Sequence, residues 1–161
     1  MLVPIIMGSR SDLEHGQAIA NALDDFGIQS EIRVASAHKA PEFLLSILAE
    51  YESNGLQKVY ITVAGRSNAL SALIDAQVTG PVIACPPYSS RFGGADIFSS
   101  LRMPSGVAPA VVVAPSGAAL VAAKIFGLTD PNIAVAISKM RVGMSDKIRS
   151  DDAELRGGGA A

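Results

Sequence analysis

Polar and charged residues gather in four short stretches of an otherwise apolar sequence. These stretches are Gly8–Asp12 (GSRSD), Ser36–Lys39 (SAHK), Gly65–Asn68 (GRSN) and Pro86–Ser90 (PPYSS). Each one follows an apolar run with the pattern of a buried β-strand. Ligands of an open parallel sheet bind beyond the carboxyl ends of the strands, so we expect all four stretches to border one crevice.

The first stretch, which Gly8 opens, could bind a phosphate group. It joins a strand to a helix N-terminus, where free N–H groups and the helix dipole favour an anion, and Ser9 and Ser11 add hydroxyl donors. It is neither a Walker loop nor a dinucleotide fingerprint. A plain serine-rich turn is an equally good interpretation of these residues. In either case Asp12 would cap the helix, accept ribose hydroxyls, or do both.

The second stretch carries His38, whose imidazole is the side chain best suited to move a proton near neutral pH. The neighbouring Lys39 adds a positive charge that could hold a phosphate or a carboxylate. A histidine in a loop is more often a solvated bystander. The expected position of His38 in the same crevice as GSRSD raises it above that background.

The other two stretches give weaker signals. Gly65 allows close approach of the backbone, but an asparagine cap preceded by a solvent-facing Arg66 is the more ordinary interpretation of GRSN. Tyr88 could cover a ring or simply belong to a loop. Cys85, at the end of an apolar strand, is expected to be a small buried hydrophobe, and His15 a surface residue of the first helix.

One further segment, Ser99–Gly106 (SSLRMPSG), precedes the fifth predicted strand. It should therefore lie at the edge of the sheet opposite the crevice of its own subunit. If Arg102, Met103 and Ser105 contribute to a ligand site, they would do so in a neighbouring subunit. Otherwise the segment is a structural turn.

Strands and helices are predicted to alternate along the chain. Apolar runs predict strands at Leu2–Met7, Ile28–Val34, Val59–Ala64, Val82–Cys85 and Ala110–Val113. Helical periodicity predicts helices at Leu13–Phe26, from Pro41 with Phe43, Leu44, Ile47, Leu48 and Tyr51 on its inner face, and at Ala69–Gln77, Gly94–Leu101 and Ser116–Phe126. This order predicts an α/β fold: a three-layer α/β/α sandwich around a five-stranded parallel sheet, flavodoxin-like or Rossmann-like.

A long last helix is expected from Asp130–Pro131, with an apolar stripe made of Ile133, Ile137, Met140, Met144 and Ile148. Such a stripe is usually core, although it could also pack on a neighbouring subunit. We expect one domain over residues 1–155 and a disordered Gly/Ala tail over residues 156–161.

Composition excludes several classes of protein. Hydrophobic residues make up 49% and charged residues 17% of the 161 residues, which favours a protomer that buries surface against its own copies. Thirteen Lys and Arg against fifteen Asp and Glu leave a net charge of −2, so nucleic acid is not an expected partner. One cysteine suits a reducing compartment, and neither a leader nor a membrane span is expected, so the prediction is a cytoplasmic protein.

Taken together, GSRSD, SAHKAPE, ITVAGRSNALSALI, ACPP and SSLRMPSG resemble the PurE family of purine biosynthesis, phosphoribosylaminoimidazole carboxylase, from Val3 to about Ile148. One class of this family, which rearranges N-carboxyaminoimidazole ribonucleotide, typically reads SAHRTP and AGxAAHL. This chain has Lys39 in place of that arginine and AGRSNAL in the third loop. It therefore resembles the second class, which carboxylates 5-aminoimidazole ribonucleotide (AIR) directly with CO2 to 4-carboxy-5-aminoimidazole ribonucleotide (CAIR).

The resemblance implies roles for the crevice residues. His38 would transfer the proton, the ribose phosphate end would lie at Ser9, Ser11, Asp12, Ser36 and Lys39, and the imidazole and CO2 would be bordered by Gly65, Arg66 and Ser67. Gly8, Ala37 and Ala64 would also contact the substrate. Lys39 could hold phosphate or help to place CO2. The resemblance also implies no cofactor, no metal and a homo-octamer with sites near subunit junctions, where Arg102, Met103 and Ser105 could contribute.

Two other classes share the predicted topology. A flavodoxin-like binding module usually stacks aromatic side chains on its flavin, whereas this chain has no Trp and three Tyr. A phosphoacceptor regulator needs an aspartate at the end of the third strand, where this chain has Gly65. Both are poor fits to the sequence.

Overall fold

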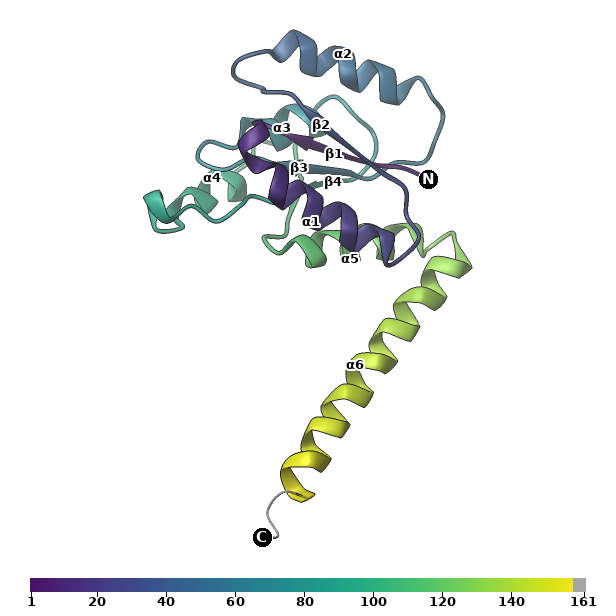
Figure 1. The fold of residues 1–161 in the computed structure, drawn as a ribbon. Helices are drawn as coiled ribbons and strands as arrows, with labels where there is room; N and C mark the ends of the chain where they lie inside the picture. Colours follow the sequence, from purple (N-terminus) through teal and green to yellow (C-terminus); the bar gives the residue numbers. More distant parts are fainter. Residues whose placement is uncertain (158–161) are drawn as a thin grey trace.

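The computed structural model describes residues 1–157 and contains one five-stranded parallel sheet (Figure 1). Its strands follow the order β2-β1-β3-β4-β5. Their bounds are β1 Val3–Met7, β2 Ser30–Val34, β3 Tyr60–Val63, β4 Val82–Ala84 and β5 Ala110–Val111. Because the chain leaves β1 first toward β2 and later reaches β3 on the other side, the carboxyl ends of β1 and β3 form a topological switch point.

Helices cover both faces of the sheet, so the predicted three-layer α/β/α sandwich is confirmed. Alternate residues of β1 face opposite layers: Ile5 packs in the core under α1 and α5, and Ile6 packs in the core under α2 and α3. The helices are α1 Leu13–Asp24, α2 Pro41–Glu52, α3 Ala69–Asp75, α4 Phe98–Leu101, α5 Pro115–Phe126 and α6 Pro131–Gly157.

Element ends differ from the predicted ones by a few residues. The strand predicted at Ala110–Val113 is shorter in the structure, over Ala110–Val111, and one further ladder bond follows it, from the N–H of Val112 to the carbonyl of Ala84 at 2.9 Å. The helix α2 begins at Pro41 as predicted, with Pro at its first position. The prediction that Phe43 lies on the inner face of α2 is wrong, since Phe43 is 53% exposed while Leu44 is buried.

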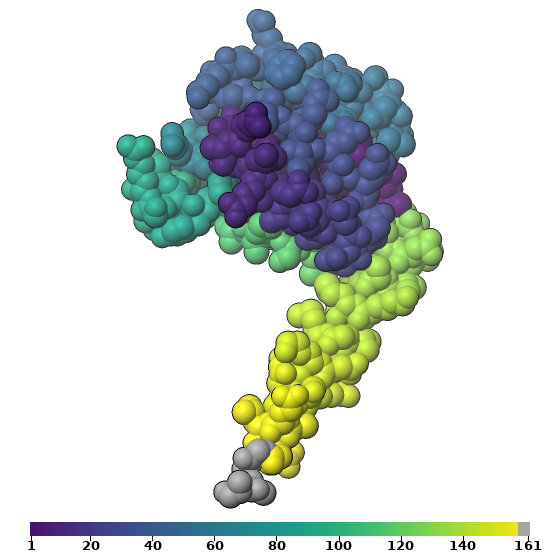
Figure 2. Space-filling model, viewed as in Figure 1, coloured from purple at the N-terminus to yellow at the C-terminus, as the bar shows by residue number. Residues whose placement is uncertain are grey.

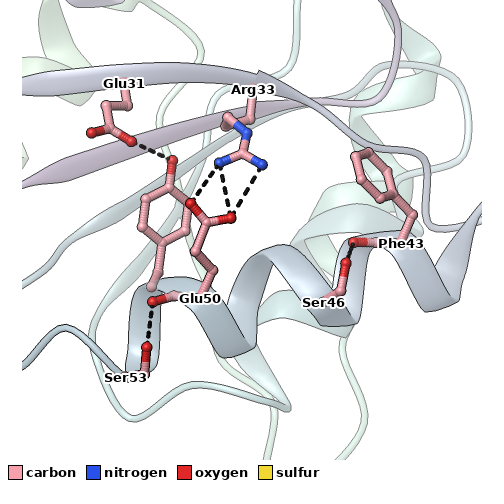
Figure 3. Close-up of polar contacts among 7 residues, drawn as sticks. Glu31, Arg33, Phe43, Ser46, Glu50 and Ser53 are labelled. Carbon is pink, nitrogen blue, oxygen red and sulfur yellow. Dashed lines mark hydrogen bonds and ion pairs between the residues drawn. The ribbon is translucent and has the colours of Figure 1, made fainter.

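Polar contacts tie the edge strand β2 to α2 (Figure 3). The hydroxyl of Tyr51 donates to Glu31 at 2.9 Å, and the guanidinium of Arg33 pairs with Glu50 at 3.3 Å. Burial, together with the bond to Glu31, raises the pKa of Tyr51 to about 12, so this donor keeps its proton at neutral pH. The contacts hold the two elements that flank the SAHK stretch.

The last helix is core only at its start. Ile133 and Ile137 are buried, whereas Met144 and Ile148 are 63% and 68% exposed. The helix then projects away from the sheet as an isolated rod (Figures 1 and 2). It runs through Arg156 and Gly157, which the sequence assigned to the tail, so the predicted tail begins too early, and residues 158–161 lie outside the described residues.

No helix within residues 1–157 has both the length and the apolar character that crossing a membrane requires. The longest one, α6, carries many charged side chains along residues 139–156.

The packing of α1 on the sheet generates a test of the fold. Leu23 is fully buried in the core with α5, so Leu23→Ala leaves a cavity and should lower the free energy of unfolding by about 2–5 kcal/mol. Leu128→Ala makes the same chemical change at a side chain that is 84% exposed and should cost under about 0.5 kcal/mol. Urea unfolding at a fixed protein concentration measures both, and equal losses would contradict the assigned core.

Candidate active site

A crevice of about 700 Å³ opens at the carboxyl edge of the sheet, above the switch point. The four polar stretches meet there. Its lining includes the twelve residues that the sequence proposed for one protomer: Gly8, Ser9, Ser11, Asp12, Ser36, Ala37, His38, Lys39, Ala64, Gly65, Arg66 and Ser67. Residues up to 59 positions apart in sequence therefore face one volume, a size that suits a small ligand.

The GSRSD stretch forms a tight hydroxyl-lined turn. Oγ of Ser9 accepts from the backbone N–H of Ser11 at 3.2 Å and from its hydroxyl at 2.9 Å. The carboxylate of Asp12 makes no side-chain cap bond to α1, so its expected role as a helix cap is wrong. Ser9, Ser11 and Asp12 all line the cavity.

The SAHK stretch is a turn between β2 and α2. The backbone N–H of Lys39 donates to Oγ of Ser36 at 3.3 Å, and that of Ala40 donates to the carbonyl of Ser36 at 2.9 Å. His38 and Lys39 are exposed, and their side chains form no hydrogen bond or ion pair with residues 1–157. Both groups are therefore available to a ligand.

The third loop is shaped by its neighbours. Oδ1 of Asn68 accepts from the N–H of Ser71 at 3.2 Å, so Asn68 caps α3 as the ordinary interpretation predicted. Arg66 has a φ of 61°, in the left-handed region that non-glycine residues rarely adopt. Its N–H donates to Oδ2 of Asp96 at 2.8 Å.

The expectation that His15 is a surface residue of the first helix is wrong. Its ring lines the crevice, and Nε2 lies 3.3 Å from Sγ of Cys85. The signal was present in the spacing, because His15 stands one turn before Ile19 and two before Leu23, both buried. Burial lowers the pKa of His15, against the opposing effects of the Cys85 backbone and the Asp12 charge, so the neutral ring is favoured.

The fourth stretch, PPYSS, also borders the crevice as expected, and α1 and α3 contribute further lining residues. Tyr88, left open between a ring cover and a loop, is 78% exposed at the mouth of the cavity. The remaining lining residues are Glu14, Ala18, Leu70, Pro87 and Ser89. Glu14 and Ala18 belong to α1 and Leu70 to α3, and no sequence motif marked these three positions.

The SSLRMPSG segment, Ser99–Gly106, is only partly where the sequence placed it. Oγ of Ser99 accepts from the N–H of Asn68 at 2.7 Å, so the start of the segment lies at the crevice edge and not at the opposite one. The reason is that α4 folds back over the third loop before the chain returns to β5. Arg102, Met103 and Ser105 are absent from the lining of this protomer's crevice.

The buried thiol beside His15 should be chemically inert. Burial raises the pKa of Cys85 to about 12, so the reactive thiolate is scarce at pH 8. We expect native protein to resist iodoacetamide at this pH and urea-unfolded protein to be alkylated at once, as followed by intact mass. Since Cys85 is the single cysteine, the readout has no background from other thiols. Rapid alkylation of the native protein would refute this description.

A doubly wound α/β protein with imidazole, ammonium and hydroxyl groups at its switch point has the arrangement of an α/β enzyme that acts on a small polar ligand. The profile of the AIR carboxylase family matches residues 2–147, and the chain belongs to this family.

Solved and curated relatives agree with this assignment. The crystal structure of Treponema denticola PurE superposes with a TM-score of 0.94 at 52% identity, covering 96% of this chain and 98% of that one. A phosphoribosylaminoimidazole carboxylase of Archaeoglobus fulgidus is 53% identical over 97% of this chain and 86% of its own length. The bifunctional carboxylase/succinocarboxamide synthetase of Rattus norvegicus is 40% identical over 96% of this chain, which spans 36% of that protein. The predicted family is thus confirmed.

Proposed function

We propose that this protein is a phosphoribosylaminoimidazole carboxylase that adds CO2 reversibly to AIR to give CAIR, with His38 as the acid/base and without ATP, cofactor or metal. The observation that carries the proposal is the meeting of His38, Lys39 and the hydroxyls of GSRSD in one crevice of a chain from the AIR carboxylase family. Relatives at 52% and 53% identity over nearly the whole chain carry the name of this carboxylase.

The nucleotide's phosphate fits the end of the crevice formed by the first two loops. Ser9 and Ser11 supply hydroxyl donors, Ser36 adds another, and the unpaired ammonium of Lys39 supplies positive charge. The carboxylate of Asp12, which makes no cap bond to α1, is an acceptor for ribose hydroxyls. In this assignment Lys39 binds phosphate, the role favoured by its exposed position on the SAHK turn.

The reacting carbon then lies between the second and third loops. The electron-rich C4 of AIR attacks the carbon of CO2, forming a C–C bond and a tetrahedral C4 that bears both hydrogen and carboxylate. Neutral His38 removes that hydrogen as a proton, its electron pair restores the aromatic ring, and the products are CAIR and the protonated imidazole. In the reverse direction imidazolium protonates C4 and CO2 departs. Positioning of this kind can supply about 7–11 kcal/mol.

The third loop and its small neighbours suit the second reactant. Ala37, Ala64 and Gly65 leave room beside the ring without adding charge, which favours neutral CO2 over bicarbonate. Arg66 and Ser67 can meet the carboxylate as it forms.

Removal of the proposed acid/base should separate chemistry from binding. His38→Asn keeps the size and polarity of the side chain but cannot take the C4 proton, so kcat should fall by about 10²–10⁴-fold or more. AIR and CAIR binding, measured by calorimetry, should change little, because the phosphate and ribose contacts remain. The circular dichroism spectrum serves as the control for folding. A variant with nearly normal turnover would remove His38 from the mechanism.

The alternative activity is rearrangement of N-carboxyaminoimidazole ribonucleotide. Lys39 and the AGRSNAL loop favour direct use of CO2, since that pair distinguishes the two classes that the family resemblance implied.

Separate supply of the two substrates decides between these activities. We expect CAIR to form from AIR and CO2 in the absence of ATP, with initial rates that rise with CO2 and not with bicarbonate in pulse experiments. Efficient turnover of freshly prepared N-carboxyaminoimidazole ribonucleotide without use of AIR would assign the protein to the mutase class instead.

We further propose a cytoplasmic homo-oligomer, an octamer by the family resemblance. Exposed apolar side chains on the projecting helix, among them Val142 at 60% and Met144 at 63%, support burial against other copies. Arg102, Met103 and Ser105, outside their own crevice, are proposed to reach a neighbour's site.

A further inference from the structure

The third crevice loop is held by a segment about thirty residues further along the chain. Besides the bond from Arg66 to Asp96 at 2.8 Å and that from Asn68 to Ser99 at 2.7 Å, Nδ2 of Asn68 donates to Oγ of Ser100 at 2.8 Å. Residues 96–100 therefore contact both ends of the turn that contains Arg66 and Ser67. Nothing in the local sequence of this turn supplies these bonds.

Arg66 needs such support. Its φ of 61° is the single positive φ of a non-glycine residue within residues 1–157. A side chain in this conformation crowds its own backbone, so the turn persists only where surrounding contacts hold it. The carboxylate of Asp96 accepts the N–H of this very residue, and a hydrogen bond to an ionised acceptor is among the stronger ones.

The same carboxylate lies against the neighbouring residue of the crevice. A Cβ atom at position 65 would stand 3.4 Å from Oδ2 of Asp96, so the carboxylate abuts Gly65 as well as Arg66. Asp96 does not form an ion pair with the guanidinium of Arg66, because the ion pairs of residues 1–157 join Arg33 to Glu50 and Lys147 to Asp151. Asp96 therefore binds the backbone N–H of Arg66, and the positive charge of the Arg66 side chain stays available to a ligand.

We propose that Asp96 is a positioning residue, whose carboxylate holds Arg66 in the left-handed conformation and so places Arg66 and Ser67 at the CO2 end of the crevice. This inference deepens the proposed function and rests on it for the identity of the reactants. Asp96 itself is absent from the crevice lining and acts through the loop. The first two loops, which bind the nucleotide's phosphate in the proposed assignment, do not depend on this bond.

The test compares Asp96→Ala with Asp96→Asn and a matched control. Asp130→Ala removes a carboxylate that accepts a backbone N–H at the same 2.8 Å, from Asn132 at the start of α6 and outside the crevice lining. Asp96→Ala should lower kcat/KM by about 10- to 100-fold, because misplacement of about 1 Å can cost that much. The loss should appear in kcat and in the KM for CO2, with the KM for AIR nearly unchanged. Asp96→Asn keeps an acceptor oxygen and should recover most of the loss, and Asp130→Ala should retain full activity.

Hydrogen exchange provides a readout that needs no turnover. Peptides covering residues 64–68 should exchange faster in Asp96→Ala than in the wild type, while peptides from β1 and β3 keep their protection. Unchanged exchange over residues 64–68 together with unchanged kinetics would overturn the proposal, as would a global loss of protection that Asp96→Asn does not restore. A wild-type protein that does not carboxylate AIR would refute the proposed function, and the exchange measurement would still decide the role of Asp96.

Discussion

Parallel pairing of β1 with β3 is the constraint on which the rest of the structure depends. Ile5 pairs with Ile61 and Met7 with Val63, so both strands end at the same edge. The chain crosses to β2 on one side of β1 and to β3 on the other, and the helices that follow β1 and β3 cover opposite faces. The loops after these strands must diverge, and the space between them becomes the crevice.

The loops around the crevice are held in shape by two different kinds of contact. The GSRSD and SAHK turns are closed by their own hydroxyls and backbone groups, with Ser9 and Ser36 as the acceptors. The AGRSN turn instead takes its shape from Asp96, Ser99 and Ser100. The two self-contained turns present the groups proposed for the nucleotide, and the externally held turn presents those proposed for CO2. Such a division lets the two reactants be positioned by different parts of the chain.

Sequence reasoning performed best where a signal is local. The strands, the start of α2 at Pro41 and the cap at Asn68 follow from alternation, fixed proline geometry and side-chain capping. Sequence reasoning failed where the position of a side chain depends on a contact with a residue far away in the sequence. His15 was expected at the surface of the first helix, although its ring lies against Cys85, seventy positions away. The exposed half of α6 was left open between core and a subunit contact, because an apolar stripe does not say which surface will cover it.

By itself, the sequence determined the order of elements, the parallel sheet, the family and the four stretches that carry chemistry. These properties depend on periodicity, on turn chemistry and on motifs that are contiguous in the chain. Only the tertiary structure decided that His15 reaches the crevice and that the side chain of Asp12 makes no cap bond to α1. It also decided that Arg66 adopts a left-handed conformation and donates its N–H to Asp96. The physical reason is that a hydrogen bond between residues thirty positions apart depends on how the intervening chain packs, which no local pattern records.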